Sequence, residues 1–305
     1  MTTASTPTAF TRLLPNGDGA GVEALAGSVR TFTAAELAAE LHSELCALEE
    51  GDARAGPGAQ AEPSARPPYT LLNMIASADG RATEQGRSGP LGARADRELF
   101  HALRTVPDAV LIGARTLRIE RYNRIVAEPQ ARAARAARGL EAEPLACVIS
   151  SSLELDPELP LLADPEAHVV IITANQATLS GVRAQVDYVR VSDGAQVDLI
   201  GAFCELRERF GVKLLLCEGG PHTALELVRA GLLDELLLTI SPRLTGGDIA
   251  SSPAGSRGVP AEVGELPEAA LPILSGEVLQ PPVGLSLVSV HSTDSFLFLR
   301  YRLRR

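Results

Sequence analysis

The sequence predicts an α/β fold with a mostly parallel central sheet, helices on both faces and an antiparallel edge formed by the C-terminal strands. One observation is the apolar run Leu214–Cys217, which is followed by two glycines, Pro221 and a helical pattern. A second is that short apolar runs alternate with helical patterns along the chain. A third is that residues 285–291 and 296–302 alternate between apolar and polar, as antiparallel strands do.

Residues 1–67 are predicted to form an N-terminal arm with one helix and a flexible linker. The helix spans residues 33–48, and Thr33 followed by Glu36 has the spacing of a capping box. Between residues 50 and 68 the composition shifts to Gly, Ala, Pro, Glu and Arg, which is typical of a linker. We expect the arm to pack on the main domain or on a partner subunit, and not to be a second catalytic domain.

Residues 68–305 are predicted to form the main domain. Further strands are expected at 69–75, 109–112, 146–150, 168–173, 188–191 and 235–241. Helices are expected at 96–105, 131–139 and 197–210, with another beginning at Pro221. The polar stretch 248–264, rich in Gly, Pro and Ser, predicts a surface loop.

The composition argues against several classes of protein. A net charge of −10 and an aromatic content of 4% argue against nucleic-acid binding. No run approaches 18 apolar residues, so we expect a cytoplasmic protein without a membrane partner. The four cysteines have neither C-x-x-C spacing nor a nearby histidine cluster, so no metal site is expected. Cys147 and Cys217 lie in apolar runs and are expected to be buried thiols.

The turn after Leu214–Cys217 is the first candidate site. Gly219 and Gly220 precede a helix whose first N–H groups lack partners and whose dipole is positive there. Glycines also let a phosphate approach the backbone. The same glycines would equally make a plain strand-to-helix turn, and the pattern is neither the dinucleotide fingerprint nor a Walker loop. The residues alone leave both interpretations open.

Three blocks, in the same order along the chain, resemble the riboflavin-biosynthesis pyrimidine reductase family. They are residues 73–80, residues 113–116, and residues 218–221 with 233–242 and Gly246-Gly247. The resemblance covers about residues 68–303 and implies a dihydrofolate-reductase-like fold. Residues 1–67 contain neither the H-x-E nor the P-C-x-x-C of the zinc deaminase that some members carry. The resemblance therefore implies a stand-alone reductase.

The resemblance implies NADPH as the cofactor, bound beyond the carboxyl ends of the strands. The expected cofactor contacts are Ala76, Gly113, Thr116, Glu120, Ser150, Gly219, Gly220, Pro221, His222 and Thr223. The glycines and the first helix amides would hold the pyrophosphate, and Arg115 and Arg118 are candidates for the 2′-phosphate. For Thr116 the alternative role is a helix cap.

The implied substrate is a phosphorylated pyrimidine, with a ribosylamino group whose open-chain imine accepts hydride at C1′. The expected substrate contacts are Asn73, Asp79, Ser88, Arg104, Arg124 and Glu218, with Ser88, Arg104 and Arg124 on the phosphate side. Glu218 is the catalytic candidate, because a carboxyl beside a cleft can handle a proton. An ordered water is the alternative acid. Asp79 could instead orient a turn, and Arg104 could be a solvated charge at a helix end.

Two departures from the family pattern keep other functions open. Asn73 stands where many members have Lys, and Glu120-Arg121-Tyr122-Asn123-Arg124 replaces an acidic stretch that contains proline. A reductase with another substrate, such as dihydrofolate, and a non-enzymatic nucleotide-binding regulator are the alternatives. The closing strands and the leucine face of the arm helix offer surfaces for a homodimer.

Overall fold

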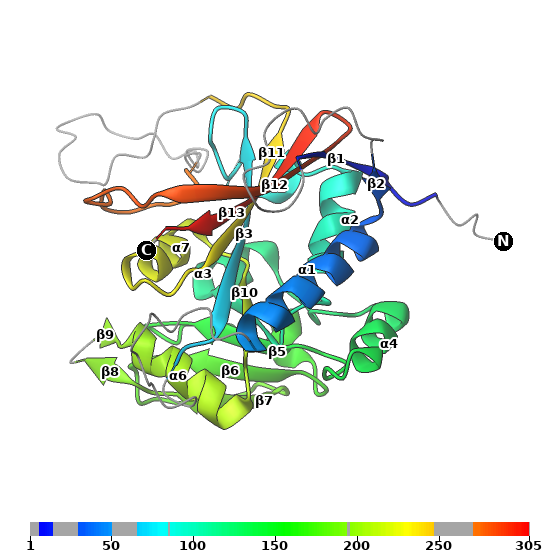
Figure 1. Ribbon diagram of the computed structural model, residues 1–305. Coiled ribbons are helices and arrows are strands. Elements are labelled where there is room, and N and C mark those ends of the chain that lie inside the picture. The colour runs from blue at the N-terminus through cyan, green and yellow to red at the C-terminus, as the bar shows by residue number, and fades with distance from the viewer. Residues whose placement is uncertain are drawn as a thin grey trace, which may run out of the picture.

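The computed structural model describes residues 6–14, 30–50, 66–84, 86–193, 196–246 and 271–304. Its centre is an 11-stranded sheet in the order β2-β1-β12-β13-β11-β3-β10-β4-β5-β6-β7 (Figure 1). Residues 51–65 of the expected linker, Gly247 and the expected loop at 248–264 lie outside the described residues. No helix in the described ranges is long and apolar enough to cross a bilayer.

Seven neighbouring strands of this sheet are parallel. They are β11 (Glu235–Ser241), β3 (Tyr69–Ser77), β10 (Leu214–Cys217), β4 (Ala109–Gly113), β5 (Leu145–Ile149), β6 (His168–Ile172) and β7 (Gln185–Val189). In all but the edge strand β7 most side chains are buried on both faces, which explains why these strands appear in the sequence as apolar runs without alternation. The expected mostly parallel sheet is confirmed.

The antiparallel edge is also confirmed, and it is wider than expected. Strand β13 (Phe296–Leu303) pairs with β11 on one side and with β12 (Leu285–Thr293) on the other. Two strands of the N-terminal arm, β1 (Phe10–Leu14) and β2 (Thr31–Phe32), then extend the sheet beyond β12. Phe10 is fully buried, and its ring meets Phe298 edge to face at 5.1 Å. The sequence did not predict β1 or β2.

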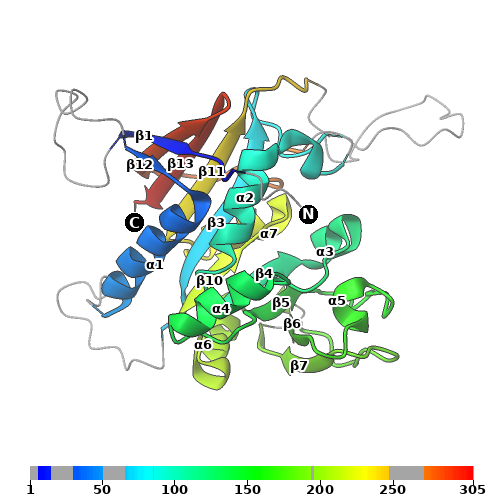
Figure 2. The same ribbon diagram turned by 90° about the vertical axis from the view of Figure 1, so that its right-hand side faces the viewer.

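Helices cover both faces of the sheet (Figures 1 and 2). On one face lie α1 (Ala34–Glu50), α2 (Arg94–Leu103), α3 (Ala114–Glu120), α4 (Pro129–Ala137) and α5 (Pro160–Ala163), around one apolar cluster. On the other face lie α6 (Leu199–Phe210) and α7 (Pro221–Arg229), around a second cluster. The short elements are the 3-10 turn η3 (Gly89–Leu91) and the small strand pair β8 (Ser192–Asp193) and β9 (Gln196–Val197).

The expected capping box at the start of α1 is confirmed. The Thr33 amide donates to Glu36 Oε2 at 2.6 Å, and the Glu36 amide donates to Thr33 Oγ1 at 3.2 Å. The helix then buries Leu41 and Leu45 in the cluster shared with α2 to α5. The described part of the arm is thus built into the same sheet and core as residues 66–304.

Candidate active site

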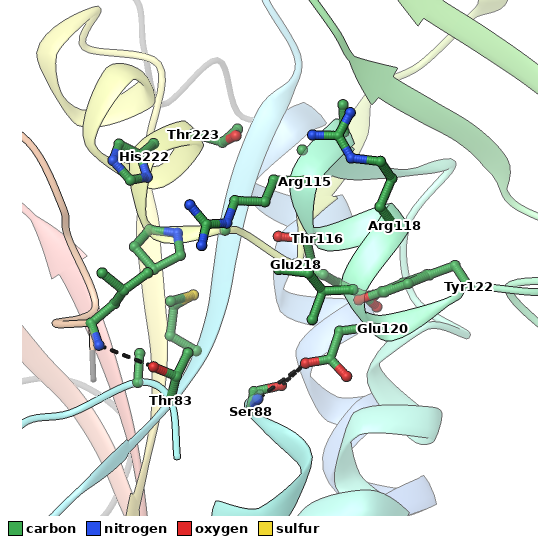
Figure 3. Close-up of a pocket in the computed structure, with 18 of the residues that line it drawn as sticks. Thr83, Ser88, Arg115, Thr116, Arg118, Glu120, Tyr122, Glu218, His222 and Thr223 are labelled. Atoms are coloured by element: carbon green, nitrogen blue, oxygen red, sulfur yellow. Dashed lines mark hydrogen bonds between the residues drawn. The ribbon is translucent and has the colours of Figure 1, made fainter. Parts of the chain in front are cut away.

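A cavity of about 690 Å³ lies at the carboxyl ends of β3, β4, β5 and β10, where parallel sheets commonly bind ligands. Its volume is within the range of about 300–1,000 Å³ that is common for small-molecule sites. Figure 3 shows its wall: His222 and Thr223 come from α7, Arg115, Thr116 and Arg118 come from α3, and Glu218 lies deep between them. The blocks that are far apart in the sequence therefore meet at one site.

Most of the expected site residues line this cavity. Those that do are Asn73, Ser88, Arg104, Gly113, Thr116, Glu120, Ser150, Glu218, Gly220, Pro221, His222 and Thr223. Ala76, Asp79, Arg124 and Gly219 are outside its lining.

The turn between β4 and α3 packs directly against the turn between β10 and α7. The Gly113 amide donates to the Gly219 carbonyl at 2.8 Å. A Cβ at Gly113 would lie 2.6 Å from Thr223 Oγ1, and a Cβ at Gly220 would lie 2.7 Å from Thr116 Oγ1. Glycine at both positions therefore allows this close approach without displacing either threonine hydroxyl. The N-cap of α3 is Gly113, so Thr116 lies within the helix and is not its cap.

The N-terminus of α7 opens on the cavity. Its N-cap is Gly220, which offers no side chain to bond the first amides, and Pro221 occupies the first turn. His222 and Thr223 follow and line the cavity. Unpaired first-turn amides and a positive helix end suit a phosphate group. With the hydroxyls of Thr116, Thr223 and Ser150 on the same wall, these residues fit the pyrophosphate of a dinucleotide cofactor.

The floor of the cavity holds a buried ion pair. Arg104 Nε and Nη2 each donate to one oxygen of Glu218 at 2.7 Å, and Arg104 Nη1 donates to the Ile125 carbonyl at 3.2 Å. The two side chains are 8% and 1% exposed. Burial acts to lower the pKa of Arg104, but the Glu218 carboxylate outweighs it and the pKa is raised. Arg104 is thus a fixed partner of Glu218 and not a solvated charge at a helix end.

Aromatic rings surround this ion pair. The Arg104 guanidinium lies 4.2 Å from the centre of the Phe100 ring and 5.1 Å from that of Tyr122. Burial, and then the neighbouring Glu218 charge, raise the pKa of the Tyr122 hydroxyl well above its usual value. Tyr122 stands in the stretch that departs from the family pattern, but no pattern in the sequence indicates that it reaches Glu218.

The three residues expected on the phosphate side all donate to carboxylates. The amide and hydroxyl of Ser88 both donate to Glu120 Oε1 at 3.0 Å, as the dashed line in Figure 3 marks. Arg104 is held by Glu218, as described above. Arg124 donates to Asp164 Oδ2 at 3.0 Å and to Glu166 Oε2 at 2.6 Å, outside the cavity lining.

Asp79 fastens a turn beside the site. Its carboxylate accepts from the Ser77 hydroxyl at 2.5 Å and from the amides of Gly246 and Thr245 at 2.8 and 3.2 Å. The Ser77 hydroxyl, followed by these amides, lowers the pKa of Asp79. This geometry corresponds to the turn-orienting role, while the substrate contact of Asp79 stays a prediction. Ala76 is buried within β3. The Gly219 carbonyl accepts the hydrogen bond from the Gly113 amide.

One cavity carboxyl was missed by the sequence analysis. Asp96, in the first turn of α2, lines the cavity together with Phe100 and Arg104. Spacing by four residues indicates that these three share a helix face, and this was the available signal. The hydroxyl that acts to lower the pKa of Asp96 belongs to Thr239 on β11, which lies far along the chain.

Comparison with known proteins agrees with this geometry. Residues 68–270 match the model of the RibD C-terminal domain. The chain belongs to the RibD C-terminal domain family. The resemblance to riboflavin-biosynthesis pyrimidine reductases is thereby confirmed, together with the dihydrofolate-reductase-like α/β fold that it implied.

Among curated relatives, the chain is similar to two archaeal proteins named 2,5-diamino-6-ribosylamino-4(3H)-pyrimidinone 5′-phosphate reductase. The one from Archaeoglobus fulgidus is 28% identical over 183 residues, which is 59% of this chain and 83% of the relative. The one from Methanothermobacter thermautotrophicus is 26% identical over 195 residues, which is 63% of this chain and 86% of the relative.

Among solved structures, the chain is similar to a pyrimidine reductase-like protein from Corynebacterium diphtheriae. The TM-score is 0.59 at 25% identity, and the match covers 81% of this chain and 96% of the other. The riboflavin biosynthesis reductase of Saccharomyces cerevisiae shares the fold at a TM-score of 0.53 and 17% identity, over 81% of this chain and 94% of the other.

Proposed function

We propose that the chain is an NADPH-dependent reductase that transfers hydride to C1′ of a ribosylamino-pyrimidine 5′-phosphate. The observation that supports this most directly is the single cavity shared by the α7 N-terminus and the Arg104–Glu218 floor. The α7 N-terminus suits a dinucleotide phosphate, and the Arg104–Glu218 pair suits a polar heterocycle. The names of the archaeal relatives supply the class of substrate.

On the cofactor side of the cavity, we expect the chain to bind NADPH and to orient it. The amides of His222 and Thr223 and the hydroxyls of Thr116 and Thr223 hold the pyrophosphate, while Ser150 lies toward the adenosine. Arg115 and Arg118 are the candidates for the 2′-phosphate, with one terminal nitrogen of Arg118 donating to the Glu154 carbonyl at 2.8 Å. Bound NADPH supplies the hydride, and the chain supplies its alignment with the acceptor carbon.

On the acceptor side, the floor fixes the heterocycle. Glu218 is held by Arg104 with both oxygens in place, so it is a preorganised acceptor for N–H groups. Phe100 offers an apolar ring, and Asn73 can donate or accept, although it brings no charge. Because both Glu218 oxygens already accept from a guanidinium, a positioning role suits Glu218 better than the proton-donating role expected from the sequence.

A second candidate function is favoured by the carboxylates at the expected phosphate contacts. Ser88, Arg104 and Arg124 all donate to carboxylates, and the nearby negative charge of Glu120 and Glu218 opposes a substrate phosphate. An acceptor without a phosphate at this position, such as dihydrofolate, would not require these arginine and serine contacts with carboxylates to be broken.

Steady-state kinetics separates the two candidates. NADPH oxidation is followed with the ribosylamino-pyrimidine phosphate and, separately, with dihydrofolate. The leading proposal predicts a kcat/KM at least about 100-fold higher for the pyrimidine phosphate, since two or more charge-assisted bonds distinguish the substrates. A preference for dihydrofolate would replace it with the second candidate. Steady turnover of either one excludes a purely regulatory nucleotide-binding protein.

We further propose that the chain forms a homodimer through the outer face of its antiparallel strands. Four large apolar side chains are exposed there: Leu13 on β1, Leu285 and Leu287 on β12, and Leu297 on β13. Contiguous apolar groups of this kind commonly mark protein interfaces. The cytoplasmic location stays a prediction from the sequence.

A further inference from the structure

A carboxyl with no ion-pair partner among the described interactions lies in the wall of the acceptor side. Asp96 sits in the first turn of α2, one helical turn before Phe100 and two before Arg104. All three side chains line the cavity, so this face of α2 presents a carboxyl, an aromatic ring and a guanidinium in succession. The helix carries them across β3 and β11, as Figure 2 shows.

The surroundings of Asp96 are fixed and mostly uncharged. The Thr239 hydroxyl, which is 4% exposed on β11, acts on this carboxyl to lower its pKa. One carboxyl oxygen lies against Gly92, where an added Cβ would be only 2.7 Å away. The Ser241 hydroxyl donates to the Leu91 carbonyl at 2.8 Å and ties the segment before α2 to the same strand. The carboxyl is thus held at the cavity wall by backbone and strand.

We propose that Asp96 is a catalytic acid of this site, which donates a proton to the nitrogen of the acceptor's C=N bond as hydride reaches the carbon. The inference rests on the proposed function. Asp96 lines the same cavity as the Arg104–Glu218 floor and lies on the same helix as Arg104's neighbour Phe100.

The groups named above account for every atom and electron of this step. Hydride from bound NADPH forms the new C–H bond, and the π-electron pair of the C=N bond moves to nitrogen. That nitrogen takes the proton of the Asp96 carboxyl, which leaves a carboxylate and an amine. The cofactor is oxidised, the C=N bond is reduced, and the carboxylate regains a proton from solvent. Both candidate acceptors, the open-chain imine and dihydrofolate, offer a C=N bond.

The charges around Asp96 agree with this role. Burial raises the pKa of the Asp96 carboxyl, while the Thr239 hydroxyl and the Arg97 charge oppose the increase. The neighbouring strands present Ile75 and Thr239, neither of which titrates in this range. Glu218, by contrast, is neutralised by Arg104. Of the three carboxyls that line the cavity, Glu218 is thus held by Arg104 and Glu120 accepts from Ser88, which leaves Asp96 as the acid.

The kinetic test compares wild type, Asp96→Asn and Thr239→Val with each acceptor under saturating NADPH. For wild type, kcat falls as pH rises through the pKa of Asp96, because the acid form is lost. Asp96→Asn lowers kcat about 100-fold or more and removes this decrease. Thr239→Val keeps the decrease but moves it to higher pH, because the hydroxyl that stabilises the carboxylate is gone. Glu98→Gln, on the same helix but outside the cavity lining, leaves the profile unchanged.

A spectroscopic titration provides a readout that does not depend on turnover. In protein labelled with carboxyl-13C aspartate, one resonance titrates above the usual aspartate range of about 4, and it is absent from Asp96→Asn. If that resonance is missing, or if Asp96→Asn keeps kcat within about threefold and retains the pH profile, the assignment of Asp96 is overturned while the proposed function stands. If wild type neither binds nor oxidises NADPH, the proposed function fails, and the catalytic role of Asp96 fails with it.

Discussion

At the scale of the residue, the Arg104–Glu218 pair is the costliest arrangement in the site. A guanidinium and a carboxylate have both been removed from water, and the two bonds between them, each 2.7 Å, compensate for that desolvation. Arg124 forms the same kind of bonds with Asp164 and Glu166, but with its side chain 25% exposed. The two arginines, both expected to bind phosphate, therefore provide a matched comparison.

Replacing Arg104 with Ala is expected to destabilise the protein by about 3–5 kcal/mol, because Glu218 would remain as a buried unpaired charge. Arg124→Ala is expected to cost less than about 1 kcal/mol, since solvent screens the more exposed pair. Urea unfolding followed by circular dichroism measures both values by linear extrapolation. Equal losses for the two variants would show that the ion pair on the cavity floor is not buried in solution.

Residue-scale prediction from sequence succeeded where the partners are neighbours in the chain. Thr33 and Glu36 are three residues apart, and their reciprocal hydrogen bonds were foreseen. It failed for Asp96 and Thr239, and for Ser88 and Glu120, because no local rule connects residues that only the fold brings together. The engagement of Ser88 and Arg104 by carboxylates was invisible for the same reason.

At the scale of the element, the strands that are buried on both faces were found from their apolar runs, and β12 and β13 from their alternation. Strands β1 and β2 were missed because they are short and their pairing is remote. Arg12 on β1 lies opposite His291 on β12, so the strand that pairs with β1 lies at the other end of the chain. Short strands of this kind carry too few residues for a clear pattern.

The outer face of the antiparallel strands leads to a prediction about assembly. Light scattering on wild type is expected to give about twice the chain mass of 32.0 kDa. Leu287→Asp is expected to give a monomer, because it places a charge among the exposed leucines of this face. Ile200→Asp, an equally exposed apolar position on α6, is the control and is expected to remain dimeric. A wild-type mass near 32.0 kDa would exclude the homodimer.

At the scale of the whole molecule, parallel topology explains why separate blocks could be assigned to one site. Strands β3, β10, β4 and β5 are adjacent and parallel, so the residues after each strand meet at one edge of the sheet. The sequence could locate those strand ends, and the family resemblance implied their convergence. It could not show which side chains turn into the cavity, as Arg124 and Asp79 demonstrate.

In the proposed function, the turn between β10 and α7 binds the pyrophosphate of NADPH. Calorimetry with NADPH and NADH on wild type, Gly220→Asp and Ala133→Asp tests this binding. Ala133→Asp adds the same charge at an exposed position of α4, away from the cavity. A Cβ at position 220 also presses on Thr116 Oγ1, so circular dichroism must show that Gly220→Asp keeps its fold.

We predict that wild type and Ala133→Asp bind NADPH with micromolar affinity and more tightly than NADH. Folded Gly220→Asp should bind neither nucleotide, because its carboxylate occupies the phosphate position and repels the ligand. If Gly220→Asp binds NADPH with wild-type affinity, the cofactor does not bind at this turn. If wild type binds neither nucleotide, the chain has kept the family fold without its hydride chemistry.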